Sequence, residues 1–224
     1  MNHEASAAGE AALRATAIAD LYAALSACFS PPSEAMAQAA RRGALAKPLQ
    51  AAATAVGMDR ERLAVTLAAL HDARSAEDGD LENLRVEYAR LFAGPGMPVA
   101  PPYESVHLDG EEAGRSGPLW GLATYAVRDA YEAAGLTPRP GPEPPDQLAA
   151  ELEFAANLAL AESDAWDAGR AEDAGMAGER RSAFVREHLG RWAPGLAARV
   201  IAEARQPLYR AAGALLEGIL DLER

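Results

Sequence analysis

Four carboxylates gather around one predicted helix start, and they are the side chains best placed for polar chemistry. Glu143, Asp146, Glu151 and Glu153 follow closely on a proline-rich break. One interpretation is structural: Asp146 caps the helix, and the glutamates stabilise the positive end of its dipole. The other is functional: part of the cluster faces a groove and receives guanidinium groups from a partner. Spacing alone favours the structural interpretation.

The histidines give no recognisable metal site. His3, His71, His107 and His188 have no second His or Cys at the short spacings of zinc sites. Glu104 and His107 form one Glu-x-x-His, whereas di-iron helical bundles use this motif twice, on helices. We therefore expect neither a metal nor another cofactor.

Enzyme motifs are equally sparse. Ser105 and His107 lie two positions apart in an extended segment and lack a positioned third residue, so they give little support for hydrolysis. The sequence contains no G-x-x-x-x-G-K-[ST], G-x-G-x-x-G or G-x-S-x-G motif. Phosphate-cradling loops and nucleophile elbows are therefore absent in recognisable form.

Composition limits the possible partners. A net charge of −12 and a pI near 4.8 argue against nucleic acid and anionic membranes, which favour Lys and Arg. Cys28 is the only cysteine, so no internal disulfide can form. The N-terminus lacks the features of a signal peptide, and no stretch approaches the ~18 apolar residues that span a bilayer. We expect a soluble, cytoplasmic protein without membrane insertion.

Helical periodicity runs through the first half of the chain. After a disordered tail over residues 1–10, a helix is expected from Ala11 to Phe29. Ser33 and Asp59 are predicted to cap two of the following helices. A helix over 77–92 then leads into a proline-rich central loop.

The central loop, over 93–109, interrupts the helical pattern. Its four prolines between Pro95 and Pro102 favour a stiff, extended chain. Its apolar residues Met97, Val99, Tyr103 and Val106 indicate an ordered loop packed on the body.

The second half is helical again. Gly135 is a helix stop signal, and a second proline-rich break over 137–145 precedes the helix that Asp146 is expected to cap. Gly169 to Gly178 is expected to be a surface connection or a break within a helix pair. Two closing helices are predicted, from Leu196 to Ala204 and from Pro207 to Leu222. The fold class is all-α: over 11–224, a compact single-domain bundle of roughly eight to ten helices.

Three motifs, in this order, resemble the TorD/DmsD/NarJ family of redox-enzyme maturation chaperones. The first is EYARLFAGP, from Glu87, which leads into PPYES, from Pro101. The second is EPPDQLAAELEF, from Glu143. The third is EHLGRW, from Glu187, followed by a helix around PLYR. The resemblance covers residues 13–222.

The resemblance implies an all-helical chaperone, not an enzyme. Such a chaperone binds the twin-arginine signal peptide, the apo form, or both, of a molybdopterin-containing oxidoreductase of the DMSO reductase superfamily. Such a chaperone assists cofactor insertion and delays export. The implied partner is the molybdoenzyme catalytic subunit, through its signal peptide and its mature part, and the chaperone is a monomer or a homodimer.

The resemblance also suggests a peptide-binding site. We expect Asp146, with Glu143 or Glu151, to receive the arginines, because a carboxylate can bind a guanidinium through two hydrogen bonds. Gln147 stands where the family usually has His, so a role that needs imidazole charge is not available there. The remaining expected site residues are Tyr88, Leu91, Phe92, Pro101, Tyr103, Glu104 and Ser105.

Two other functions remain open. A docking or assembly factor for a mature respiratory subunit would share the fold without reading a signal peptide. A metal-dependent hydrolase has the least support from the residues.

Overall fold

A computed structural model describes residues 2–74, 80–94, 96–109, 117–137 and 143–223, with side chains from Ser6 onward. These residues form eleven α-helices, one π-helical turn and no β-strand. The α-helices are α1 (Asn2–Phe29), α2 (Glu34–Arg41), α3 (Ala46–Val56), α4 (Arg60–Asp72), α5 (Leu81–Tyr88), α6 (Glu104–Leu108), α7 (Leu122–Ala133), α8 (Leu148–Asp167), α9 (Ala171–Glu187), α10 (Leu189–Glu203) and α11 (Pro207–Leu222). The π-helical turn, η1 (Ala89–Ala93), directly continues α5. The predicted all-α fold is confirmed.

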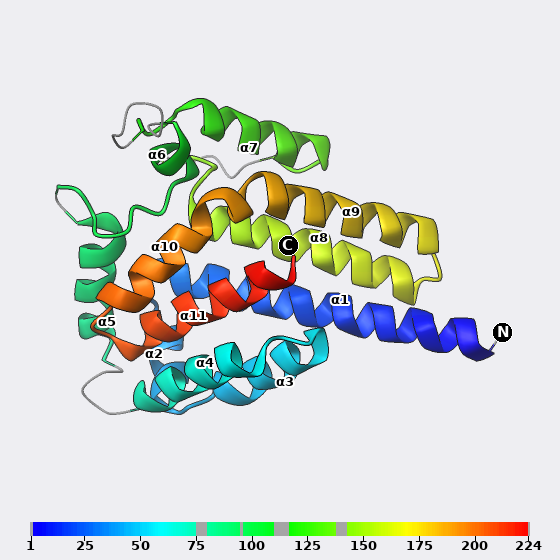
Figure 1. Ribbon diagram of the computed structural model, residues 1–224, viewed down its shortest axis with the longest axis horizontal. Coiled ribbons are helices and arrows are strands. Elements are labelled where there is room, and N and C mark those ends of the chain that lie inside the picture. Colours follow the sequence, from blue (N-terminus) through cyan, green and yellow to red (C-terminus); the bar gives the residue numbers. More distant parts are fainter. Residues whose placement is uncertain (1, 75–79, 95, 110–116, 138–142, 224) are drawn as a thin grey trace.

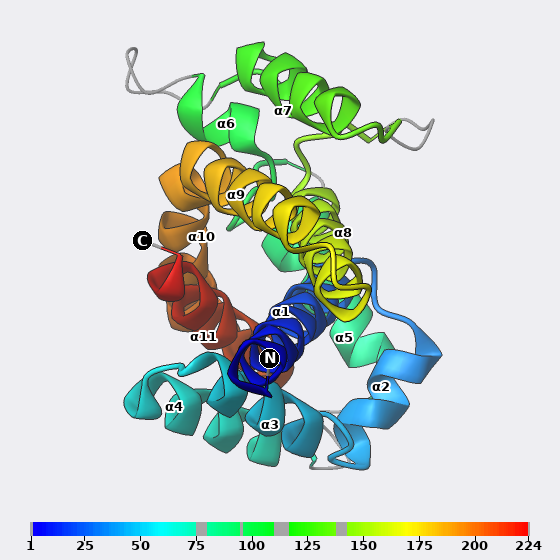
Figure 2. The same ribbon diagram turned by 90° about the vertical axis from the view of Figure 1, so that its right-hand side faces the viewer.

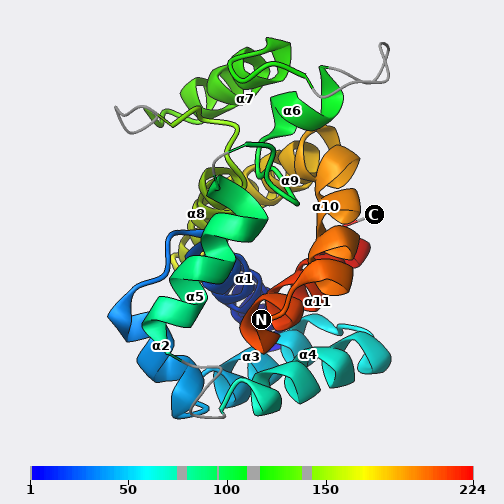
Figure 3. The ribbon, with the colours of Figure 1, turned by 90° about the vertical axis from the view of Figure 1, so that its left-hand side faces the viewer.

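The long helices α1, α8 and α9 run side by side along the molecule, and α10 and α11 cross them (Figure 1). Viewed along this axis, α3 and α4 lie below α1, while α6 and α7 form an outer layer on the opposite side (Figure 2). From the other end, α5 stands in front of α1 and α8 (Figure 3). One continuous hydrophobic core joins these layers.

The first helix is the centre of this core. It packs against α8, α3 and α11, and its Leu21, Tyr22 and Leu25 are fully buried. The segment Ser6–Phe29 is also long and apolar enough to cross a membrane by length and composition alone, contrary to our expectation that no stretch would be. Of its most apolar window, 56% is buried inside the protein, so core packing accounts for much of its apolar character.

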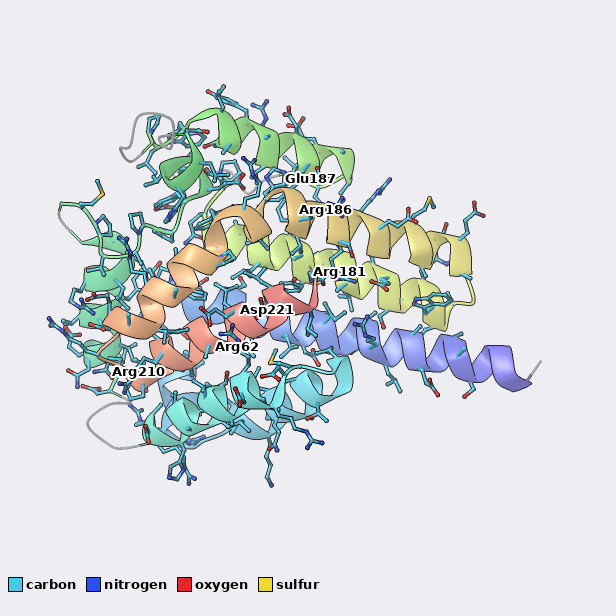
Figure 4. All side chains as sticks on the ribbon, in the orientation of Figure 1. Arg62, Arg181, Arg186, Glu187, Arg210 and Asp221 are labelled. Atoms are coloured by element: carbon cyan, nitrogen blue, oxygen red, sulfur yellow. The ribbon has the colours of Figure 1, made fainter. Side chains whose placement is uncertain are left out.

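Two arginines form ion pairs between neighbouring helices. Arg181 of α9 is buried and pairs with Glu162 of α8 at 3.3 Å and with Glu223 after α11. Arg62 of α4 pairs with Glu217 and Asp221 of α11, and Figure 4 shows Arg62 and Asp221 close together. Removing one partner of the buried pair around Arg181 should cost more than removing one partner of the half-buried pair around Arg62, because it leaves a buried charge unpaired.

Several predicted helix ends are confirmed. Ser33 caps α2 by accepting a hydrogen bond from the Met36 N–H, and Asp59 caps α4 in the same way. Gly135 follows α7 with φ of 76°, and the Leu136 N–H donates to the Tyr131 carbonyl. This is a Schellman ending, which requires a residue that accepts positive φ.

Other expected boundaries differ from the structure. Residues 2–10, expected as a disordered tail, extend α1, because this alanine-rich stretch favours helix. The central loop over 93–109 is interrupted by α6. Gly169, with φ of 71°, makes a short turn, and α9 then runs through most of the connection expected over 169–178. The helix expected from Leu196 begins at Leu189 and contains Pro194, which lies inside the helix and removes one of its backbone hydrogen bonds.

Glu87 ties the π-helical turn to the loop between α10 and α11. Its carboxylate accepts hydrogen bonds from Arg90 at 2.8 Å and from the Arg205 N–H at 2.6 Å. Burial by itself would raise the pKa of Glu87, but these hydrogen bonds outweigh it and hold the pKa below its usual value. The network thereby fixes the turn that carries Leu91 and Phe92.

Candidate functional site

A groove of about 780 Å³ lies where the end of α1, the α5–η1 helix, α7 and the start of α8 meet. Much of its wall is aromatic or proline. The Tyr88 and Phe92 rings lie 5.3 Å apart, and the Tyr131 and Phe154 rings lie 4.5 Å apart. The groove-lining rings and prolines are Tyr88, Phe92, Tyr103, Trp120, Tyr131, Phe154, Pro31, Pro102, Pro144 and Pro145.

The polar part of the groove is predominantly acidic. Glu132, Glu143 and Glu153 line it and are exposed. Of the lining residues that the structure describes, Arg128 alone is basic. It is engaged by Asp129 at 3.0 Å and by the face of Tyr125 at 5.2 Å. The groove therefore combines an apolar wall with a negative rim, a combination suited to a ligand that is cationic at one part and apolar at another.

Two extended segments meet at one wall of the groove. Tyr103 and Gln147 form an isolated antiparallel bridge, and the Leu148 N–H donates to the Pro102 carbonyl at 2.8 Å. Tyr103 and Gln147 line the groove, and Tyr103 donates its hydroxyl hydrogen to Glu143 at 2.6 Å.

Glu104 and Asp146 are each next in sequence to one of these bridge residues, and both are buried. The wall therefore has a groove side and a buried side.

A buried hydrogen-bonded pair, Glu104 and His188, anchors this wall from behind. Glu104 is 1% exposed, and both of its carboxylate oxygens contact Nδ1 of His188 at the start of α10, at 3.0 and 3.2 Å. Burial raises the pKa of Glu104, and the hydrogen bond from His188 opposes that rise. The pair joins residues that are far apart in the chain, so it fixes α6 against α10.

Asp146 does not cap α8. Its Oδ2 accepts a hydrogen bond from the Ser105 N–H at 2.8 Å, so its carboxylate binds a backbone donor in the first turn of α6. The cap of α8 is Gln147, whose Oε1 accepts from the Ala149 N–H at 2.7 Å and the Ala150 N–H at 3.2 Å. The prediction that Asp146 caps this helix is therefore wrong by one residue, because the Asp146 side chain finds its donor across the wall.

Glu151 lies in the same buried region. Glu151 is fully buried, and neither of its carboxylate oxygens accepts a hydrogen bond of ordinary geometry. Burial raises the pKa of Glu151 well above its usual value, and the charges of Glu104 and Asp146 raise it further, while the indole N–H of Trp192 opposes them. The fold therefore favours a protonated, uncharged Glu151.

Residues 50–198, more than half of the chain, match the sequence profile of the family described as nitrate reductase delta subunit. The chain belongs to this family. The family match and the similarity to TorD together confirm the expected assignment to the TorD/DmsD/NarJ redox-enzyme maturation chaperones.

Two of the similar proteins are named chaperones. The chain is 28% identical, over 157 residues, to the chaperone protein TorD of Vibrio cholerae (Classical Ogawa 395), a match covering 70% of this chain and 67% of TorD. TorD of the El Tor Inaba strain is 29% identical over the same length and coverage. A crystal structure of a redox enzyme maturation protein of Archaeoglobus fulgidus aligns with 73% of this chain and 91% of that chain, at 25% identity and a TM-score of 0.40.

The expected site residues of this chaperone divide into two groups. Those that line the groove are Tyr88, Phe92, Tyr103, Glu143 and Gln147. The others do not line it: Leu91, Pro101, Glu104, Ser105, Asp146 and Glu151. All of the latter except Pro101 are buried, so the carboxylates of Asp146 and Glu151 have no open path to a guanidinium in this structure.

Several site residues of the chaperone were not selected from the sequence. Glu153 belongs to the acidic cluster at the start of α8 and differs from Glu151 in being exposed. His188 lies within the EHLGRW motif, but no local pattern pairs it with Glu104. Trp120 has the periodicity of a core residue yet is 50% exposed.

A metal or hydrolytic centre finds no support among the described residues of the chaperone. They contain no group of three or more His, Cys, Asp and Glu side chains arranged to hold a metal ion. Glu104 of the Glu-x-x-His pairs with His188, whereas His107 Nε2 contacts the Pro101 carbonyl at 2.8 Å. The Ser105 side chain is fully buried.

Proposed function

We propose that this chaperone binds, in the cytoplasm, the twin-arginine signal peptide of a molybdopterin-containing oxidoreductase of the DMSO reductase superfamily. By holding the signal peptide, it delays export while the client receives its cofactor. The observation that carries this proposal is the groove, where an aromatic wall and exposed carboxylates lie side by side.

The arginines of the peptide are received by Glu143 and Glu153. Both line the groove and both are exposed, unlike Asp146 and Glu151. Glu143 accepts the Tyr103 hydroxyl hydrogen, which orients its carboxylate without removing its charge. Arginine is preferred to lysine, because its planar fork donates two hydrogen bonds to one carboxylate.

The apolar stretch of the signal peptide packs on the aromatic wall. Tyr88, Phe92 and Phe154 offer rings that are already fixed by packing, so little side-chain entropy is lost when the peptide binds. Ordering the peptide offsets much of the apolar gain, so we expect a dissociation constant of about 1 μM. That affinity permits release of the client.

The proposal is tested by titrating a fluorescent synthetic peptide that carries two arginines followed by an apolar stretch. Glu143→Gln and Glu153→Gln should each weaken binding about tenfold, because each removes one charge-assisted contact. A peptide with Lys-Lys in place of Arg-Arg should also bind more weakly. Glu172→Gln, at the first turn of α9, is the matched control and should bind as the wild type does.

Two outcomes would count against this proposal, and the second would favour docking on the mature subunit. Unchanged affinity in both groove variants would disprove the arginine-receiving role. If the full client subunit binds equally well with its signal peptide deleted, the protein is a docking factor for the mature subunit and does not read the signal.

A further inference from the structure

Exposed apolar side chains concentrate beside the groove. Five of the eleven large apolar residues that are exposed in the described part of the chain lie between Leu119 and Leu136. Four of them, Leu119, Trp120, Leu122 and Tyr125, follow closely on one another in sequence at the start of α7, and we call them the ledge. Their exposures are 52%, 50%, 81% and 49%. Such a concentration of apolar surface is typical of an interaction site.

The ledge is continuous with the groove. Trp120 belongs to both, because it also lines the groove, and Leu136 lines the groove beyond the other end of α7. A ligand that leaves the groove past Trp120 therefore meets further apolar surface.

Trp120 is held in a conformation that large residues avoid. Its φ is 63°, the only positive value for a residue other than glycine in the described chain. Close to it, the Ala123 N–H at the start of α7 donates a hydrogen bond to the Asp109 carboxylate at 3.2 Å. A Cβ on Gly121 would collide with this carboxylate. The chain therefore turns sharply at Trp120, and the strained, half-exposed indole is presented at the groove rim.

The groove is too small to enclose the apolar stretch of a signal peptide. At about 780 Å³ it has the size of a pocket for one drug-sized ligand, whereas that apolar stretch has roughly 7–15 residues. If the arginines lie at Glu143 and Glu153, part of the stretch must extend outside the groove. No charged residue interrupts the chain from Leu119 to Tyr125.

We propose that the ledge binds the distal part of the apolar stretch of the client's signal peptide, with Trp120 as the residue that joins ledge and groove. This inference rests on the proposed function and extends its site over the start of α7. Peptides with longer apolar stretches are then preferred, and the ledge determines that preference.

The test uses two fluorescent peptides on the full-length protein. The short peptide has two arginines and four apolar residues, and the long peptide has two arginines and twelve apolar residues. Wild-type protein should bind the long peptide about tenfold more tightly. The double variant Leu119→Ser/Leu122→Ser should lose this gain and leave the affinity for the short peptide unchanged. Val65→Ser on α4, a residue that is 54% exposed, is the matched control.

Trp120→Asn separates binding from folding. Asn accepts the positive φ at this position more readily than Trp, so thermal stability should stay the same or rise. Affinity for both peptides should nevertheless fall. A structural role alone would instead lower thermal stability.

Each result decides the inference. Equal affinity of wild type for the two peptides, or unchanged length preference in the ledge variant, overturns it, while the groove variants still test the proposed function. Loss of binding to both peptides in the ledge variant also overturns it, because the ledge would then not hold a separate part of the peptide. Failure of wild type to bind either peptide overturns both proposals.

Discussion

His188→Ala is expected to lower the free energy of unfolding by about 2–4 kcal/mol, because it removes a packed ring and leaves a buried carboxyl without its hydrogen-bond partner. Glu104 is 1% exposed and would lose its contact with Nδ1 of His188. The substitution would also remove the ring contact between His188 and Phe184, whose centroids lie 4.8 Å apart. Loss of the imidazole should raise the pKa of Glu104 further, because His188 opposes the effect of burial.

Chemical denaturation at pH 7 measures this effect, with His71→Ala as the control. His71 is exposed on α4, so its replacement should change stability by less than about 0.5 kcal/mol. The double variant Glu104→Met/His188→Phe should lose far less than His188→Ala, because it leaves no buried polar group without a partner. A cost below about 1 kcal/mol for His188→Ala would show that the pair does not anchor the groove wall.

Amide exchange gives a local measurement of the same contact. The N–H groups of Glu104, Ser105 and Leu148 donate across the wall behind the groove. In His188→Ala they should exchange faster than amides in α1 if the pair holds the two segments together.

Glu151→Gln is expected to raise the free energy of unfolding, and the gain should grow with pH to about 1–3 kcal/mol. Burial raises the folded-state pKa of Glu151 above the unfolded value of about 4.3, so the folded protein holds this proton more tightly. The stability from this group is fully present below the unfolded pKa and declines as pH rises through the folded-state pKa. Glutamine is neutral at every pH, so the free energy of unfolding of the variant should not fall in this way as pH rises.

Denaturation of wild type and variant from pH 5 to pH 9 tests this sign. Glu153→Gln, on the exposed face of the same helix, is the matched control and should follow the wild-type profile within about 0.5 kcal/mol. If the free energy of unfolding of wild type and of Glu151→Gln changed in parallel with pH, folding would not shift the pKa of Glu151. Glu153→Gln should still weaken peptide binding, which separates the structural carboxylate from the ligand-binding one.

Local signals in the sequence accounted for much of the fold. Apolar periodicity gave the all-α class, and Pro207–Leu222 is the helix α11 with the predicted bounds. Ser33, Asp59 and Gly135 act at helix ends as predicted, because capping depends on residues within one turn of each other. The motifs from Glu87 and Glu143 also led to the correct family.

Neighbouring acidic residues could not be assigned roles in the same way. Asp146, Glu151 and Glu153 belong to one acidic cluster in the sequence, yet only Glu153 is exposed. The difference comes from their position around α8 and from the helices that cover it, which are distant in sequence. Gln147 caps α8 in place of Asp146 for the same reason, because Asp146 accepts its hydrogen bond from the Ser105 N–H, which is distant in sequence.

The sequence by itself therefore determined the helices, the family and the pool of residues from which a peptide site could be built. Tertiary structure alone decided which of them face a groove, paired Glu104 with His188, and placed Trp120 in a strained turn at the rim. The physical reason is that helix formation and capping are governed by nearby residues, whereas burial and ion pairing depend on contacts between distant segments.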